Sequence, residues 1–215
     1  MKGIIFDLDG VIIHTDHYHF LAWKKMCERY DLDFNETINH KLRGVSRKQS
    51  LDIILDHNDK LISDGQKKEM TDIKNDIYQS YLSKLSIDDL DDDVKDTLDQ
   101  LKKSGYKLAI GSSSKNAKYI LRQIGLIDFF QIISDGTNIS KSKPHPEVFL
   151  NASIGLNLEP KDCIVIEDAV SGIKAAKAAQ MIAVAIGDAK QSELADYKIN
   201  NVLEIIKIME KLEKA

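Results

Sequence analysis

The stretch Ile4-Ile5-Phe6-Asp7-Leu8-Asp9-Gly10-Val11 decides the fold. Its apolar start predicts a buried strand, and its two acids would point to the same side if the strand continued. Gly10 allows the chain to leave the strand in a backbone conformation that other residues disfavour. Two carboxylates at the end of a strand favour a hard cation and can divide nucleophilic and proton-transfer roles, although an isolated pair is equally compatible with a solvated turn.

Length and composition exclude several classes of function. The 215 residues are 43% hydrophobic and 30% charged, with a formal net charge of -4, as expected for one sizeable core or a core with a small lid. A nucleic-acid-binding protein should be basic, and no apolar run reaches the roughly 20 residues that cross a bilayer. We therefore expect neither a nucleic-acid nor a membrane partner.

The compartment is indicated by the cysteines and by the first residues. Cys27 and Cys163 are far apart and have no nearby cysteine partner, which is typical of a reducing compartment. The chain enters its first strand directly, which leaves no room for a signal peptide. We expect a cytoplasmic protein.

Two sequence patterns divide the chain. Residues 16–84 have apolar residues at helical spacing and no strand-like run, whereas helices and strands alternate from residue 94 onward. The expected helices cover 94–104, 116–124, 146–155, 171–179 and 202–212, and the expected later strands cover 106–111, 130–134, 163–166 and 181–186. This alternation predicts an α/β fold, a Rossmann-like doubly wound parallel sheet with helices on both faces.

The helical block interrupts this fold immediately after the first strand. We expect a core domain formed by residues 1–14 and 88–215, and an inserted all-helical cap domain formed by residues 15–87. A helical lid beside the carboxyl ends of the strands would exclude water from a site there.

Polar residues follow four of the predicted core strands. They are Asp7 with Asp9, the segment Ser112-Ser113-Ser114-Lys115-Asn116, Lys143 before Pro144, and Glu167 with Asp168. Because the carboxyl ends of parallel strands meet at one edge of a sheet, we expect these groups to converge. This convergence, rather than any single motif, predicts an active site.

The residue types fit phosphoryl chemistry. Serines with exposed amides before a helix can hold an anion, and a lysine at the same edge can neutralise a phosphoryl group. Mg²⁺ takes one or two carboxylates together with substrate phosphate and water, and Glu167 and Asp168 would supply oxygens opposite Asp7. Taken singly, the serines and the acidic pair could be helix caps and Lys143 a surface charge.

With these motifs in this order, the chain resembles the haloacid dehalogenase superfamily of phosphohydrolases and phosphotransferases, in its helical-cap subclass. The cap makes the chain similar to one branch, the β-phosphoglucomutase family. The matching residues are Thr15, Tyr18-His19-Phe20 with Trp23, Leu42-Arg43-Gly44-Val45-Ser46-Arg47 with Ser50, Lys74-Asn75-Asp76, and Ser112-Ser113-Ser114-Lys115-Asn116. This resemblance implies a Mg²⁺-dependent isomerase that interconverts β-D-glucose 1-phosphate and D-glucose 6-phosphate through β-glucose 1,6-bisphosphate.

The resemblance also implies a role for each matched residue. Asp7 would be the nucleophile that becomes an aspartyl phosphate, making the enzyme a phosphoprotein, and Asp9 the general acid and base. The implied metal ligands are Asp7, Asp9, Glu167 and Asp168. The implied substrate-binding residues are Thr15, His19, Trp23, Gly44, Val45, Ser46, Arg47, Ser50, Lys74, Ser112, Ser113, Ser114, Lys115, Asn116 and Lys143. Arg47 would grip the phosphate that is not reacting, since a guanidinium offers paired donors. The partners would be small sugar phosphates, and the protein a monomer.

Three other functions stay open. A Mg²⁺-dependent sugar-phosphate phosphatase would use Asp7 and Asp9 but would need no second phosphate site. A phosphonate hydrolase would need a cap lysine as a Schiff-base nucleophile, for which Lys24 and Lys25 are the candidates. A non-catalytic sugar-phosphate sensor could dispense with Asp7 or Asp9, and both are present.

Overall fold

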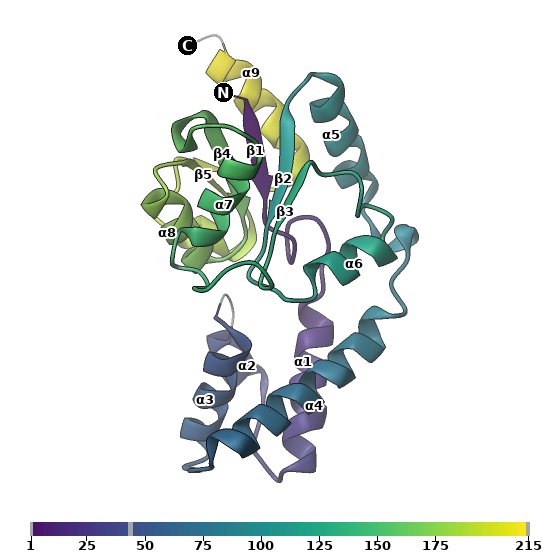
Figure 1. The fold of residues 1–215 in the computed structure, drawn as a ribbon, viewed down its shortest axis with the longest axis vertical. Coiled ribbons are helices and arrows are strands. Elements are labelled where there is room, and N and C mark those ends of the chain that lie inside the picture. The colour runs from purple at the N-terminus through teal and green to yellow at the C-terminus, as the bar shows by residue number, and fades with distance from the viewer. Residues whose placement is uncertain (1, 43–44, 214–215) are drawn as a thin grey trace. The chain divides into compact units, whose positions relative to one another are not determined.

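The structure is a computed structural model of the chain and describes residues 2–42 and 45–213 (Figure 1). It divides into two compact units. One consists of Met1–His14 and Ser86–Ala215, and the other of Thr15–Leu85. We call the first the core unit and the second the cap unit. The inserted unit ends at Leu85, where the sequence predicts an end at residue 87.

A six-stranded parallel sheet forms the centre of the core unit, with the strand order β3-β2-β1-β4-β5-β6. The strands are β1 (Gly3–Phe6), β2 (Lys107–Gly111), β3 (Ile132–Ser134), β4 (Cys163–Glu167), β5 (Ile182–Ala185) and β6 (Tyr197–Lys198). Ile4 on β1 pairs with Leu108 on one side and Ile164 on the other. The run of apolar residues is required because a central parallel strand is buried on both faces.

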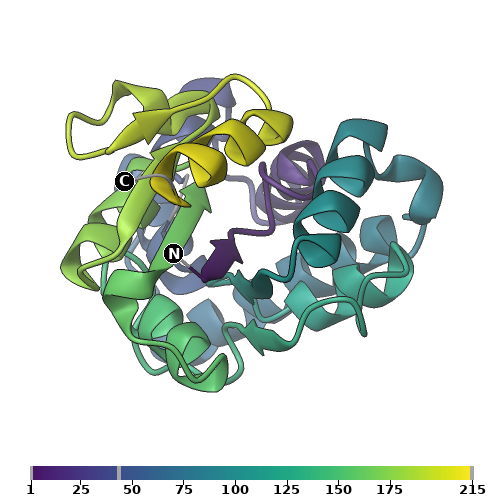
Figure 2. The same cartoon turned by 90° about the horizontal axis from the view of Figure 1, so that it is seen from above.

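Helices cover both faces of this sheet. They are α5 (Asp92–Lys103), α6 (Ala117–Gln123), α7 (Glu147–Gly155), α8 (Val170–Ala178) and α9 (Ile205–Glu213). Figure 2 shows α7 and α8 on one face, and α5 and α9 on the other. Apolar side chains fill the first of these layers, where Phe149 of α7 and Ile173 of α8 pack with Ile5 and Val165 of the sheet. The predicted doubly wound fold is confirmed.

The direction of winding reverses at β1. The chain adds β2 and then β3 on one side of β1, and afterwards adds β4, β5 and β6 on the other. Loops diverge at such a reversal, and ligands of α/β sheets bind there, beyond the carboxyl ends of the strands. Asp7 directly follows β1 and therefore occupies this position.

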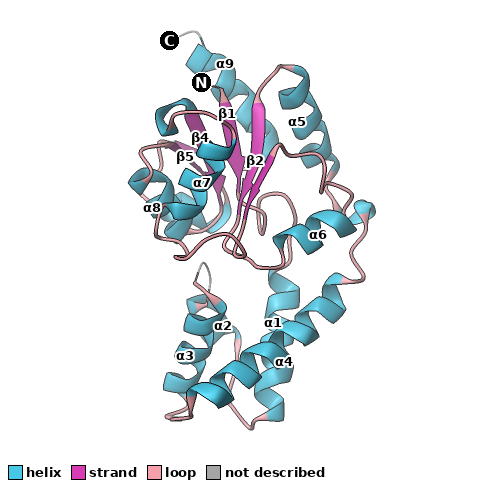
Figure 3. Ribbon diagram, in the orientation of Figure 1, coloured by secondary structure: helices cyan, strands magenta, loops and turns pink. Residues whose placement is uncertain are grey.

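The described residues of the cap unit form helices joined by loops, and Figure 3 draws no strand in them. Its helices are α1 (Asp16–Arg29), α2 (Glu36–Lys41), α3 (Arg47–His57) and α4 (Asp64–Leu82). Capping boxes start α3 and α4, formed by Ser46 with Gln49 and by Ser63 with Gln66. In the part of the chain that the structure describes, we find no helix with the length and apolar character needed to cross a membrane.

Candidate active site

Asp7 lies at the carboxyl end of the central strand. Its N–H donates to the Ile166 carbonyl at 2.9 Å, which continues the β1–β4 pairing by one residue and fixes the Asp7 backbone. The chain then turns sharply, and Gly10 adopts a φ of +82°. A Cβ on Gly10 would lie 2.2 Å from an Asp168 carboxylate oxygen. Any other residue would be strained at this φ, and its Cβ would displace the Asp168 carboxylate.

Lys143 joins the acid that follows β1, Asp7, to the acid that ends β4, Glu167. Its ammonium lies 2.5 Å from Asp7 Oδ1 and 2.7 Å from Glu167 Oε2. All three residues are buried, with exposed fractions of 5%, 6% and 1% for Lys143, Asp7 and Glu167. The Phe149 ring covers the same ammonium, with its centroid 4.9 Å away. Residues 136 positions apart thus form one buried charge network.

Burial affects the pKa of both the lysine and the glutamate of this network. Burial by itself lowers the pKa of Lys143, but the carboxylates of Asp7 and Glu167 outweigh it and hold the pKa above its ordinary value. For Glu167, burial and the neighbouring Asp7 charge raise the pKa to about 7, against the opposing effects of Lys143 and of the Ala169 N–H. One lysine therefore does not fully compensate the buried carboxylates, and the site favours further positive charge.

Three carboxylates form a group that could hold a metal ion. Oxygen atoms of Asp7, Glu167 and Asp168 all lie within 4.8 Å of one another. This all-oxygen donor set suits hard divalent cations. Asp9 does not belong to the group, so the described structure gathers three of the four acids that the sequence resemblance implies as ligands.

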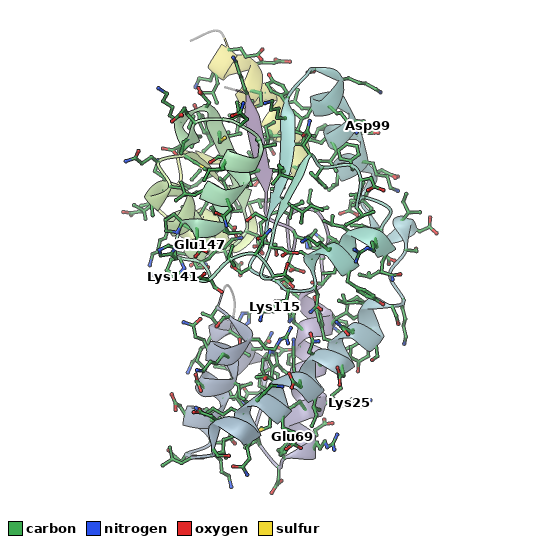
Figure 4. The ribbon with its side chains drawn as sticks, viewed as in Figure 1. Lys25, Glu69, Asp99, Lys115, Lys141 and Glu147 are labelled. Carbon is green, nitrogen blue, oxygen red and sulfur yellow. The ribbon has the colours of Figure 1, made fainter. Side chains whose placement is uncertain are left out.

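The serine loop after β2 is held by its own side chains. Ser112 Oγ accepts the Ser114 N–H, and Ser114 Oγ accepts the Asn116 N–H, both at 3.2 Å. Ser113 Oγ accepts the Lys143 N–H at 3.3 Å and so ties this loop to the Lys143 loop. Lys115 is exposed (labelled in Figure 4). The serines thus connect two of the four predicted groups, and Ser112 and Ser114 cap amides of their own loop.

In the cap unit, α1 and α4 bring a second predicted group together. Lys74 of α4 is 1% exposed, and its ammonium lies 2.8 Å from His19 Nδ1. The same ammonium lies 5.1 Å from the centroid of the Trp23 ring. Thr15, the N-cap residue of α1, is fully buried. Burial and the charges of Lys74 and Arg47 hold the pKa of His19 well below its usual value, so its imidazole is neutral.

Arg47 is the first residue of α3 and is half-buried. Burial lowers the pKa of its guanidinium, while Asp72, Tyr78 and Asp76 oppose that shift from a distance. Among the residues that the structure describes, Arg47 has no ion-pair partner. A desolvated guanidinium without a carboxylate partner is suited to binding an anion.

The remaining predicted cap residues lie around the start of α3. Ser46 is its N-cap, Val45 precedes it, and Ser50 is buried one turn into the helix. Gly44 lies outside the described residues. Ser46 and Ser50 therefore have evident roles in the helix itself, as a cap and in packing.

Comparison with known proteins identifies the family of the chain. Residues 4–186 match the family model described as haloacid dehalogenase-like hydrolase. The chain belongs to this family. The inserted helical cap and the doubly wound sheet agree with the fold that the sequence resemblance implies.

Within the haloacid dehalogenase-like family, the similar proteins include mutases and phosphatases. A β-phosphoglucomutase of Bacillus subtilis is 42% identical over 207 residues, which cover 95% of this chain and 92% of the relative. A phosphorylated carbohydrates phosphatase of Thermotoga maritima is 29% identical, covering 83% and 82%. The solved structure of a β-phosphoglucomutase from Clostridium difficile superposes with a TM-score of 0.92 at 34% identity and covers 100% of this chain and 98% of that one.

The sequence analysis missed Glu147, whose carboxylate holds the loop that carries Lys143. Its carboxylate accepts the N–H groups of Ser140 at 2.7 Å and Lys141 at 2.9 Å, three and two residues before Lys143 (Lys141 and Glu147 are labelled in Figure 4). The Ser140 N–H chiefly, with the Lys141 N–H, holds the pKa of Glu147 below its usual value. An acid at the first residue of a helix is common because it interacts favourably with the helix dipole, so no signal in the sequence distinguished Glu147.

Replacing Glu147 with glutamine is expected to lower kcat/KM for phosphoryl transfer about tenfold, because the amide can accept one of the two N–H groups but loses the charge that strengthens both bonds. The measurement is steady-state kinetics alongside a thermal melt. Glu159→Gln is the matched control, since Glu159 is exposed and makes no cap hydrogen bond. Equal activity of the Glu147 and Glu159 variants would show that the carboxylate does not position Lys143.

Proposed function

We propose that the protein is a phosphomutase of the β-phosphoglucomutase type, and so an isomerase, which interconverts β-D-glucose 1-phosphate and D-glucose 6-phosphate. The observation that carries this proposal is the 42% identity, over 95% of the chain, with a β-phosphoglucomutase. The buried Asp7 beside Lys143, Glu167 and Asp168 supplies the chemistry that such a reaction needs.

The Asp7 carboxylate attacks phosphorus in this mechanism. A bond forms between Asp7 and phosphorus, the bond between phosphorus and the sugar oxygen breaks, and Asp9 gives that oxygen a proton. In the other half of the reaction, Asp9 takes the proton from a sugar hydroxyl, whose oxygen bonds to the phosphorus of the aspartyl phosphate while the bond between phosphorus and Asp7 breaks and frees the carboxylate. β-Glucose 1,6-bisphosphate is the intermediate, and it must turn around between the two halves so that each phosphate can react.

Charge compensation is the main task of the other core residues. The Lys143 ammonium, held against Asp7, offsets negative charge on the phosphoryl group, which is how most phosphoryl transfer is catalysed. Mg²⁺ bound by Asp7, Glu167 and Asp168, with Asp9 as a further ligand, would offset the same charge. Amides and side chains of residues 112–116 contribute to holding a phosphate from the core unit.

The cap residues would serve the second phosphate and the sugar. Arg47 is the residue that would bind the phosphate that is not reacting. Its guanidinium is half-buried and has no ion-pair partner among the described residues. Thr15, His19, Trp23 and Lys74 would contact the substrate, together with Gly44, Val45, Ser46 and Ser50 at the start of α3. These contacts would form in the state in which substrate is bound and water is excluded.

Phosphorus NMR tests the reaction directly. β-Glucose 1-phosphate is incubated with the protein, Mg²⁺ and a trace of β-glucose 1,6-bisphosphate. Conversion to glucose 6-phosphate, with little inorganic phosphate, is the expected result. Release of inorganic phosphate as the main product would instead favour the second candidate, a sugar-phosphate phosphatase, the activity named for the Thermotoga maritima relative.

Arg47→Ala is expected to separate mutase from phosphatase chemistry. Losing a bidentate grip on phosphate should lower kcat/KM for the mutase reaction about 100-fold, while turnover of acetyl phosphate, which has one phosphate, stays within about twofold. Both rates are measured on one preparation. Arg29→Ala is the matched control, because Arg29 is an exposed arginine of the same unit. An equal loss of both activities would contradict a dedicated second phosphate site.

We also propose that the enzyme works in the cytoplasm as a monomer. Cys27 and Cys163 are free and buried, and burial raises the pKa of both thiols, which makes them unreactive and suits a reducing compartment. The most exposed large apolar side chains, Leu61 and Ile154, come from different units. Sedimentation velocity that shows a dimer at micromolar concentration would contradict the monomer.

A further inference from the structure

Tyr78 of α4 is fully buried in the cap unit, and its hydroxyl has a defined partner there. The hydroxyl donates to Thr15 Oγ1 at 3.0 Å. Thr15 is the N-cap of α1, but its side chain makes no capping hydrogen bond to that helix. Because Thr15 Oγ1 accepts from Tyr78, the proton of the Thr15 hydroxyl is directed away from Tyr78.

The Tyr78 ring lies against two further residues of the proposed substrate-binding set. Its centroid is 4.4 Å from the Lys74 ammonium, and it is 4.0 Å from the centroid of the His19 ring, at an interplanar angle of 32°. A cation near an aromatic ring is attracted by the ring quadrupole, more strongly where water is excluded. The ring therefore favours the position in which the ammonium reaches His19 Nδ1 at 2.8 Å.

Helical spacing explains why the Tyr78 side chain contacts Thr15, His19 and Lys74 together. Lys74 and Tyr78 are four residues apart on α4, and Thr15 and His19 are four residues apart along the start of α1. Residues at this spacing share a face of a helix, and α1 and α4 pack against each other. The side chain of Tyr78 contacts the side chains of Thr15, Lys74 and His19.

The contact between Lys74 and His19 fixes a chemical state of the imidazole. An ammonium group has three donors and no acceptor, so His19 Nδ1 must accept. A neutral imidazole that accepts at Nδ1 carries its proton at Nε2. Nε2–H is then a donor suited to a sugar hydroxyl or a phosphate oxygen.

We propose that Tyr78 is a positioning residue of the cap, which holds Thr15 through its hydroxyl and holds Lys74 against His19 through its ring, so that His19 presents Nε2–H. The kinetic consequences of this inference rest on the proposed mutase function. The state of His19 does not, because it follows from contacts within the cap unit alone.

Two substitutions separate the contributions of Tyr78. Tyr78→Phe removes only the hydroxyl, and Tyr78→Leu removes the ring as well. The matched controls are Tyr81→Phe and Tyr81→Leu, because Tyr81 lies on the same helix and stacks on Tyr18 instead. Each variant is assessed by circular dichroism, by kcat/KM for β-glucose 1-phosphate, and by the ¹⁵N shifts of the His19 ring, which distinguish the two tautomers.

The Phe variant should lower kcat/KM about fivefold and leave the His19 shifts in place. The Leu variant should lower kcat/KM about 50-fold and move the His19 shifts toward a mixture of tautomers. The Tyr81 controls should stay within about twofold of the wild type.

Two results would overturn the proposal: unchanged kcat/KM in Tyr78→Phe, or a folded Tyr78→Leu protein whose His19 remains wholly in the Nε2–H form. If the Leu variant fails to fold, the kinetics of the Phe variant decide. If the wild type does not convert β-glucose 1-phosphate, the mutase function fails, and the His19 shifts of the two variants still decide the role of Tyr78.

Discussion

Asp7→Asn is expected to abolish phosphoryl transfer, with kcat lower by a factor of at least about 10⁴. The amide has almost the shape of the carboxylate but is not a nucleophile, so no aspartyl phosphate can form. The protein should remain folded, because Lys143 keeps its ion pair with Glu167 at 2.7 Å. The Asp7 backbone, held by the Ile166 carbonyl, is unaffected by the change.

The rate is measured with β-glucose 1-phosphate and with acetyl phosphate, since both need the same nucleophile. Asp128→Asn is the matched control, because Asp128 is an exposed aspartate of the core unit. Substantial activity of the Asp7→Asn variant toward either compound, after deamidation has been excluded by mass spectrometry, would contradict the assignment of Asp7.

The second large effect is expected from Lys143→Met, which leaves Asp7 and Glu167 buried without their lysine. Removing one partner of a buried ion pair is strongly destabilising, so the free energy of unfolding should fall by about 3 kcal/mol in the absence of divalent cations. Mg²⁺ should restore part of the loss, because the proposed metal site of Asp7, Glu167 and Asp168 exists in the native state and not in the unfolded chain. Activity should fall roughly 10³-fold, since a charge that stabilises the transferring group is lost.

Urea unfolding with and without Mg²⁺ measures this effect. The double variant Asp7→Asn, Lys143→Met should be less destabilised than Lys143→Met alone, because one of the stranded charges is gone. Lys161→Met, at an exposed lysine of the same unit, is the control. A Lys143→Met protein as stable as this control would mean that the buried network does not carry the charges assigned to it.

The core fold could be predicted because its inner strands, β1, β2, β4 and β5, are buried and therefore leave continuous apolar runs in the sequence. The run at residues 163–166 became β4, and the run at 181–186 became β5. The expected strand at 130–134 begins only at Ile132, because the Gln131 side chain, instead of a backbone carbonyl, accepts the Leu108 N–H. β6, two residues at the sheet edge, was not predicted, since Tyr197 and Lys198 carry no such pattern.

The residues of the core site could be predicted for a related reason. Parallel topology alone brings the ends of β1 and β4 together, so Asp7, Glu167 and Asp168 could be grouped from their places in the sequence. Glu147 could not, because its partners are backbone amides of a loop whose path no local pattern specifies. Tyr78 could not, because an aromatic residue at helical spacing is ordinarily part of a helix core.

Trapping the phosphoenzyme shows directly whether Asp7 is the nucleophile. The wild-type protein is mixed with β-glucose 1,6-bisphosphate and Mg²⁺, quenched, and treated with borohydride, which reduces an aspartyl phosphate to homoserine. Peptide mass spectrometry then identifies the residue. We expect homoserine at position 7 alone; homoserine at position 9, or a phosphoryl group on any other side chain, would contradict the role of Asp7 as the nucleophile.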